Sequence, residues 1–253
     1  MNPLQRALIE KLGHDHGFEH VLSSSATQVE LASARHGARV QVSLAATQGY
    51  LLTVQAAVPT LLPEMRRSLS GSWRADAFAA STEAELAALL RRAASLARAL
   101  PNQAVQDFEA EAARHIAELP EGLNGTEVAR LVRQRVGQQK FRSAMLDYWS
   151  GTCAVTGIAL REVLRASHAK PWAECSSDEE RLDVFNGFLL VANLDALFDR
   201  FLITFDDKGT LLVSPSLSGA DQERLALWPG MTLRWLSDAH RPYLSWHRER
   251  WSA

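Results

Sequence analysis

The sequence predicts an α+β fold in two parts, residues 1–120 and 126–253. The first part combines helical patterns with segments in which apolar and polar residues alternate, as they do in strands. A cluster of Pro, Gly and Asn at Pro120–Gly125 then lies between two helical patterns, which is typical of a linker. The second part begins with a long helical pattern and continues with short strand-like runs and a hairpin turn.

In the first part, apolar spacing predicts three helices, and alternation predicts three strands between the first two of them. Thr82 has Glu85 three residues later, which is the spacing of a capping box, and Pro101 ends the helix that follows Thr82. We therefore expect helices at Leu4–Leu22, Thr82–Ala99 and Val105–Leu119, and strands at Gln28–Leu31, Arg39–Leu44 and Tyr50–Val58.

The second part opens with a predicted helix at Thr126–Trp149 whose polar positions are notably basic. One interpretation is a solvated helix face. The other is a helix that contacts phosphates, where each neutralised phosphate releases counterions. Further along we expect a strand before His168, a helix at Leu194–Arg200, a hairpin formed by Phe201–Phe205 and Thr210–Ser214, a strand at Met231–Trp235 and a closing helix at Pro242–Trp251.

Composition sets limits on function. The chain has 253 residues, 47% of them hydrophobic and 22% charged, which is ordinary for a globular protein. The formal net charge of −2 gives no global basic signature, so a surface for nucleic acid must be local. Two cysteines cannot build a four-thiolate zinc site. Because we find neither the apolar core of a signal peptide nor an apolar run near the roughly 20 residues of a membrane span, we expect a cytoplasmic protein without a membrane segment.

The most informative stretch is Thr152–Phe205, in which His168, Asn186 and Asp195 follow one another. Four blocks surround them: CAVTG at Cys153–Gly157, ASHAKPW at Ala166–Trp172, RLDVFNG at Arg181–Gly187 and LFDRFLITF at Leu197–Phe205. These blocks resemble a bacterial subfamily of the HNH endonucleases, and the resemblance extends from about Arg135 to the C-terminus. It implies a C-terminal ββα-metal nuclease domain that cuts nucleic acid phosphodiesters. The chain departs from the family at Asp195, where His or Asn is usual.

The resemblance implies that His168 is the general base, a role that suits imidazole because it titrates near neutral pH. It also implies that Asn186 fixes the conformation of a loop and helps to orient this histidine. On the residues alone, a packed structural histidine and an ordinary Asn-Gly turn stay open as alternatives.

Asp195 and Asp199 are four residues apart on a predicted helix, so they share a face and repel each other unless a cation lies between them. Their oxygens suit magnesium or manganese, with zinc or nickel as alternatives. Ser167 stands where many HNH enzymes have a metal ligand, and a hydroxyl there is a weak ligand that can act through water. The alternative is that Asp199 pairs with Arg165 or Arg200, or caps the helix.

We therefore expect a metal-dependent HNH endonuclease that acts on DNA, in restriction or anti-phage defence, with the N-terminal domain recognising the target. A homodimer would suit double-strand cutting, because one HNH site cuts one strand at a time. The alternatives are a catalytically weak or inactive nucleic-acid-binding module, which Asp195 and Ser167 permit, and an effector nuclease that a ligand regulates. The candidate phosphate contacts are Arg130, Arg133, Lys140, Arg142, Arg165, Lys170 and Arg200.

Overall fold

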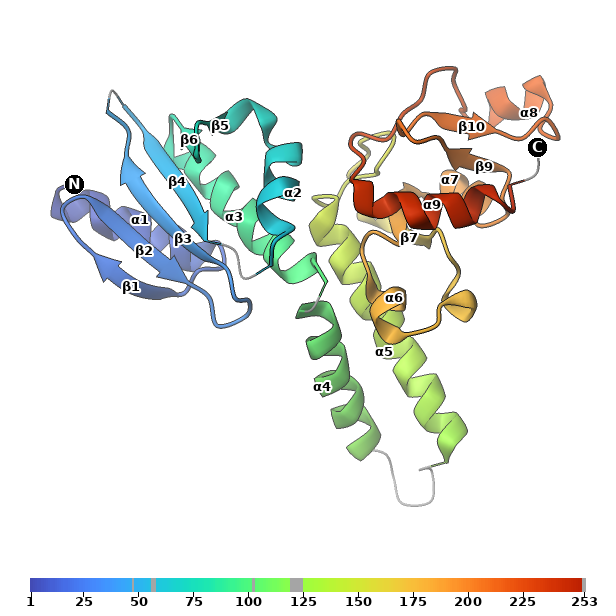
Figure 1. Ribbon diagram of the computed structural model, residues 1–253, viewed down its shortest axis with the longest axis horizontal. Helices are drawn as coiled ribbons and strands as arrows, with labels where there is room; N and C mark the ends of the chain where they lie inside the picture. The colour runs from blue at the N-terminus through green and yellow to red at the C-terminus, as the bar shows by residue number, and fades with distance from the viewer. Residues whose placement is uncertain (47, 56–57, 102, 119–124, 252–253) are drawn as a thin grey trace. The chain divides into compact units, whose positions relative to one another are not determined.

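The computed structural model describes residues 1–46, 48–55, 58–101, 103–118 and 125–251. The chain forms two compact units, Met1–Leu100 and Pro101–Ala253 (Figure 1). Both units mix helices and strands, which confirms the α+β class. Among the described helices, none has the length and apolar character that crossing a membrane would require.

The first unit is built on a six-stranded antiparallel sheet with the strand order β1-β2-β3-β4-β6-β5. Its strands are β1 (His20–Ser24), β2 (Gln28–Ala32), β3 (Arg39–Leu44), β4 (Tyr50–Gln55), β5 (Trp73–Arg74) and β6 (Ala77–Ala80). Its helices are α1 (Pro3–Asp15), α2 (Leu61–Ser68) and α3 (Glu83–Ala99). The alternation in the sequence has the expected cause, because β2 and β3 bury every second residue, among them Val29, Leu31, Val40 and Val42.

Three predicted strands and the α3 helix are present close to their expected bounds, although Ala56 and Ala57 lie outside the described residues. Thr82 caps α3 by accepting the Glu85 N–H at 3.2 Å, and Glu85 accepts the N–H of Ser81 at 2.7 Å. The first helix is shorter than expected. It ends at Asp15, and Gly17, with a φ of 98°, turns the chain toward β1.

The second unit contains helices α4 (Gln103–Ala117), α5 (Thr126–Tyr148), α6 (Asp178–Leu182), α7 (Ala192–Phe198), α8 (Gly219–Arg224) and α9 (Arg241–Arg248). Its strands are β7 (Leu164–His168), β8 (Gly187–Val191), β9 (Ile203–Phe205) and β10 (Leu211–Val213). β7 and β8 form an antiparallel pair, and α7 follows β8 directly, which gives a ββα arrangement. The predicted strand at Met231–Trp235 is reduced to one isolated bridge, between Thr210 and Thr232.

The division between the units lies before α4, whereas we placed it after this helix. The reason is that α4 packs along α5. Phe108 and Ala112 of α4 are fully buried, Glu109 accepts two hydrogen bonds from Arg133 at 2.8 and 3.1 Å, and Glu111 pairs with Lys140 at 2.6 Å. The expected linker, Pro120–Gly125, lies outside the described residues except for Gly125, the N-cap of α5.

The packing of α4 predicts which fragment of the chain folds. A fragment from Pro101 to Ala253 should unfold cooperatively, and one from Gly125 to Ala253 should be less stable by several kcal/mol, because it exposes the apolar face of α5 that Phe108 covers. Urea denaturation followed by circular dichroism measures both. Equal stability of the two fragments would show that α4 contributes nothing to the second unit.

Acid sensitivity is predicted for the first unit because of His36. Burial, with help from the charge of Arg98, lowers the pKa of His36 from its ordinary 6.5 to about 4. Between these values the unfolded chain binds a proton that the folded unit does not, so the unit loses stability as the pH falls from 6.5 toward 4. The loss should be on the order of 1–2 kcal/mol by pH 5 and smaller in His36→Phe. Hydrogen exchange of first-unit peptides at pH 7 and 5 tests this, and an equal loss in both proteins would exclude His36 as the cause.

Candidate active site

The end of β7 carries the central histidine of the candidate site. In the β7–β8 pair, His168 lies opposite Gly187. A side chain at position 187 would place its Cβ 2.1 Å from the Ser167 carbonyl oxygen, so only glycine allows this close approach. Arg142 of α5 fixes the start of the strand by donating to the Leu164 carbonyl at 2.8 Å. The backbone therefore holds His168 in a defined place.

The His168 ring is enclosed by aromatic side chains and a backbone carbonyl. It stacks on Phe141 with a centroid distance of 3.7 Å, and the Trp172 ring meets it edge-on. Its Nε2 lies 2.9 Å from the carbonyl oxygen of Arg181. Since a carbonyl can only accept, Nε2 must carry the proton, which leaves the lone pair on Nδ1. Burial lowers the pKa of His168 to about 4, so the ring is neutral at neutral pH.

Asn186 is completely buried and holds the loop beside this histidine. Its Oδ1 accepts the Lys170 N–H at 2.8 Å, and its Nδ2 donates to the carbonyls of Lys170 and Glu180, both at 3.1 Å. The next carbonyl after Glu180 is that of Arg181, to which His168 donates. Asn186 is therefore placed to fix the peptide that orients the histidine.

The two aspartates and the serine lie close to one another near the end of β7. Ser167 Oγ donates to Asp199 Oδ1 at 3.1 Å, and the N–H of Asp199, which caps α7, donates to the Asp195 carbonyl at 2.9 Å. Partial burial raises the pKa of Asp195, and the charge of Asp199 raises it further. Partial burial also raises the pKa of Asp199, while the Ser167 hydrogen bond and the charge of Arg200 oppose this.

These groups fit a small divalent cation held by few protein ligands. Two carboxylates whose pKa values are raised gain from a cation that compensates their charge. Magnesium commonly takes one or two carboxylates and completes its shell with water and phosphate oxygens. In the part of the chain that the structure describes, no cluster of three or more His, Cys, Asp or Glu side chains is arranged for a metal, so a closed zinc centre does not fit.

His168 and Asp199 line one cleft of about 290 Å³, together with Trp172, Phe201 and His247. His247 of α9 packs against α7, and its partners lie outside its own helix. Its ring stacks on Phe198 at 3.9 Å, Nε2 lies 2.9 Å from the Phe198 carbonyl and Nδ1 lies 3.0 Å from Thr204 Oγ1. No local pattern could have placed His247 here, because these contacts span more than 40 residues.

Residues 153–206 match the family model of the HNH endonucleases. The matched segment contains His168, Asn186, Asp195 and Asp199 as well as the whole ββα arrangement. No curated protein matches the chain. The match supports a nuclease, which hydrolyses phosphodiester bonds, and DNA as its substrate.

Several cations that we assigned to phosphate contacts are bonded within the unit that carries the HNH segment. Arg133 also pairs with Asp178 at 2.7 Å, Lys170 pairs with Glu180 at 2.6 Å, and Arg142 donates to two backbone carbonyls. Exposed cations remain at Arg130, Arg165 and Arg200, although Arg130 pairs with Glu127 at 3.3 Å and Arg165 donates to nearby carbonyls. The structure thus gives structural partners to Arg133, Lys170 and Arg142, and DNA contact by any of the assigned cations stays a prediction.

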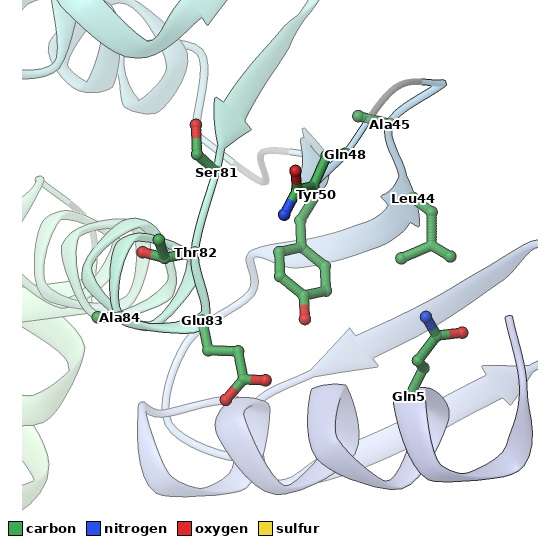
Figure 2. Close-up of a pocket in the computed structure, with 10 residues that line it drawn as sticks. Gln5, Leu44, Ala45, Gln48, Tyr50, Ser81, Thr82, Glu83 and Ala84 are labelled. Carbon is green, nitrogen blue, oxygen red and sulfur yellow. The ribbon is translucent and has the colours of Figure 1, made fainter.

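A hollow of about 680 Å³ lies in the first unit (Figure 2). Figure 2 shows the Tyr50 ring reaching into it, with Glu83 at the start of α3 and Gln5 of α1 on either side. Partial burial raises the pKa of the Tyr50 hydroxyl, and the charge of Glu83 adds to this. Among the lining residues that the structure describes none is basic, so the hollow favours neutral or cationic groups over phosphate.

Proposed function

We propose that the protein is a divalent-metal-dependent endonuclease that hydrolyses DNA phosphodiester bonds. The observation that carries this proposal is the shared cleft of His168 and Asp199, within the segment that matches the HNH endonucleases. A base and a carboxylate that face the same small space can act on one phosphate. The hydrogen bond from Ser167 to Asp199 links the carboxylate to the strand that carries the histidine, because Ser167 directly precedes His168.

The chemistry follows from the protonation states. Neutral His168 would accept a proton from the attacking water at Nδ1, while the Arg181 carbonyl keeps the other nitrogen protonated. Asp195 and Asp199, with Ser167 through water, would hold magnesium or manganese, and zinc or nickel stay open as alternatives. When bound, such a metal stabilises charge on the scissile phosphate and on the leaving oxygen. Asn186 would act as a positioning residue.

We further propose that the first unit recognises the target, and that the protein serves restriction or anti-phage defence in the cytoplasm. The resemblance of the domain layout, a variable N-terminal part before an HNH domain, supports this role. A homodimer would place two sites on opposite DNA strands. The Tyr50 hollow offers the kinds of groups that bind base edges, since Gln pairs with adenine and Glu accepts from cytosine.

A cleavage assay tests the proposal. Supercoiled plasmid, modified and unmodified, is incubated with the full chain and with magnesium, manganese, zinc or nickel. We expect nicked and linear products with magnesium or manganese and none with EDTA. Intact plasmid under every condition, together with retained DNA binding, would favour the alternative of an inactive binding module.

A second candidate function is a nuclease that a small ligand regulates, and the hollow in the first unit favours it. Its volume lies in the range of small-molecule sites. Thermal shift with nucleotides and with the corresponding nucleosides, in the absence of DNA, tests this candidate, and we expect the nucleosides to bind better because no described lining residue is basic. A shift that disappears in Tyr50→Ala would place the ligand in the hollow, and the absence of any shift would leave the recognition role as the better proposal.

We predict that His168→Ala and His168→Asn both lower the cleavage rate by on the order of 10²–10⁴, because neither side chain can accept the proton. The alanine variant should also lose some stability, since it gives up the stacking on Phe141. DNA binding should persist in both. His14→Ala, which changes an exposed histidine of α1, is the matched control. A His168→Asn enzyme that cuts at the wild-type rate would remove His168 from the chemistry.

We also predict that Asp195→Ala weakens binding of magnesium or manganese and lowers activity, because one of the two carboxylate ligands is lost. Asp195→His should keep some activity and shift the preference toward nickel or zinc, which imidazole suits. Calorimetric titration of the DNA-free protein measures this, with Asp238→Ala as a control at an exposed carboxylate. Unchanged affinity in Asp195→Ala would exclude Asp195 as a ligand.

A further inference from the structure

Phe201 occupies a backbone position that normally belongs to glycine. Its φ is 56°, in the left-handed region that side chains disfavour. It ends α7 in a Schellman motif, because its N–H donates to Phe198 and the N–H of Leu202 donates to Leu197, both at 2.9 Å. A bulky aromatic residue at such a position indicates that the ring itself has a use.

The ring of Phe201 lies at the cleft of the candidate site, two residues after Asp199. It is half-buried, so part of its surface is open to solvent. Its packing partners are on α9, with ring centroids 4.8 Å from His247 and 6.3 Å from Trp246. The guanidinium of Arg250 lies over the Trp246 ring at 3.6 Å. An aromatic surface with a cation beside it therefore borders the cleft.

We propose that Phe201 is a stacking platform for an unpaired nucleobase of the DNA, next to the phosphate that is cut. This inference rests on the proposed nuclease function and adds a substrate class to it, namely single-stranded or locally unpaired DNA. An aromatic ring stacks on any base, whatever the sequence, and each stacked base contributes substantially to binding. In an intact duplex, neighbouring base pairs cover the faces of each base, so only an unpaired nucleotide offers one.

The cations nearby fit the same substrate. Arg200 is exposed and precedes Phe201, so it is placed for a phosphate that adjoins the stacked base. Arg250 is 42% exposed at its side chain, although Glu249 lies 3.6 Å away. Two exposed cations from the neighbouring segments are thus available to the backbone of a strand that laid its base on Phe201.

The chain offers a matched control for the backbone strain. Ser150 ends α5 in the same motif, with a φ of 55°, its N–H donating to Asp147 at 3.3 Å and the N–H of Gly151 donating to Leu146 at 2.7 Å. Phe201→Gly and Ser150→Gly therefore relieve the same kind of strain, but only the first removes a ring from the cleft. Phe201→Leu keeps an apolar side chain without an aromatic face, and Phe201→Trp keeps the face.

The experiment measures binding of the full chain, by fluorescence anisotropy without divalent metal, to three probes. These are a single strand of twelve thymidines, a twelve-unit abasic strand and the duplex of the first probe with its complement. We expect the wild type to prefer the thymidine strand to both other probes. Phe201→Gly and Phe201→Leu should lose on the order of 5- to 100-fold in affinity for this strand and almost nothing for the abasic one. Ser150→Gly and Phe201→Trp should bind as the wild type does.

Thymidine-strand affinity that is unchanged in Phe201→Gly would overturn the platform, and so would a wild type that binds the abasic strand or the duplex as tightly. The same outcomes separate this inference from the nuclease proposal. If no DNA is cut with any metal but the preference for thymidine depends on Phe201, the nuclease function falls and the platform stands. If the chain cuts single strands and Phe201→Gly cuts them with the wild-type KM, the platform falls and the nuclease stands.

Discussion

The close pairing of β7 with β8 is the constraint on which the candidate site depends. Gly187 lets the strands approach so closely that any other residue would collide with the Ser167 carbonyl. This pairing fixes Ser167 and His168 at one end of β7, and it fixes the start of α7, which follows β8 without a loop. His168, Asp195 and Asp199 therefore belong to one unit of two paired strands and a helix.

Residues far away in the sequence complete this unit. Helix α9 reaches it through His247, which donates to the last residue of α7, and through Tyr243, whose hydroxyl donates to Asp183 at 3.0 Å. Burial lowers the pKa of His247 to about 4 and therefore keeps it neutral, so it can accept from Thr204 while it donates to Phe198. The left-handed backbone at Phe201 costs on the order of 1–2 kcal/mol. These contacts and the hydrogen bonds that end α7 offset that cost.

The sequence predicted best those features that depend on residues close together in the chain. His168, Asn186, Asp195 and Asp199 lie in short blocks with fixed spacing, and the structure places Ser167 within hydrogen-bonding distance of Asp199, while Asp195 lies near both. Strand β8 had no such signal, because all five of its residues are buried and an apolar run without alternation does not distinguish a strand from a helix.

Contacts between segments that are distant in the sequence could not be predicted, because no local pattern specifies them. The basic pattern of α5 left a phosphate-binding face and a solvated face open, yet Arg133 and Lys140 pair with carboxylates of α4, and Arg133 pairs with Asp178 of α6 as well. Nothing in the local sequence specifies these pairings. The position of His247 depends likewise on how α9 folds back on α7 and β9.

Burial has opposite consequences for the two kinds of titratable group at the candidate site, and both would suit the proposed catalysis near neutral pH. It lowers the pKa of His168, which favours the unprotonated form that the proposed base would require, although it would also make that base weaker than an exposed imidazole. It raises the pKa values of Asp195 and Asp199. The two carboxylates also repel each other, so a positive charge between them would stabilise the pair. A cation that binds this pair would lower both pKa values. Because Ser167 donates a hydrogen bond to Asp199 and directly precedes His168, such a cation would lie near the end of the strand that carries the histidine. On the proposed mechanism, a cation at the carboxylates would therefore supply the charge that the protein ligands lack.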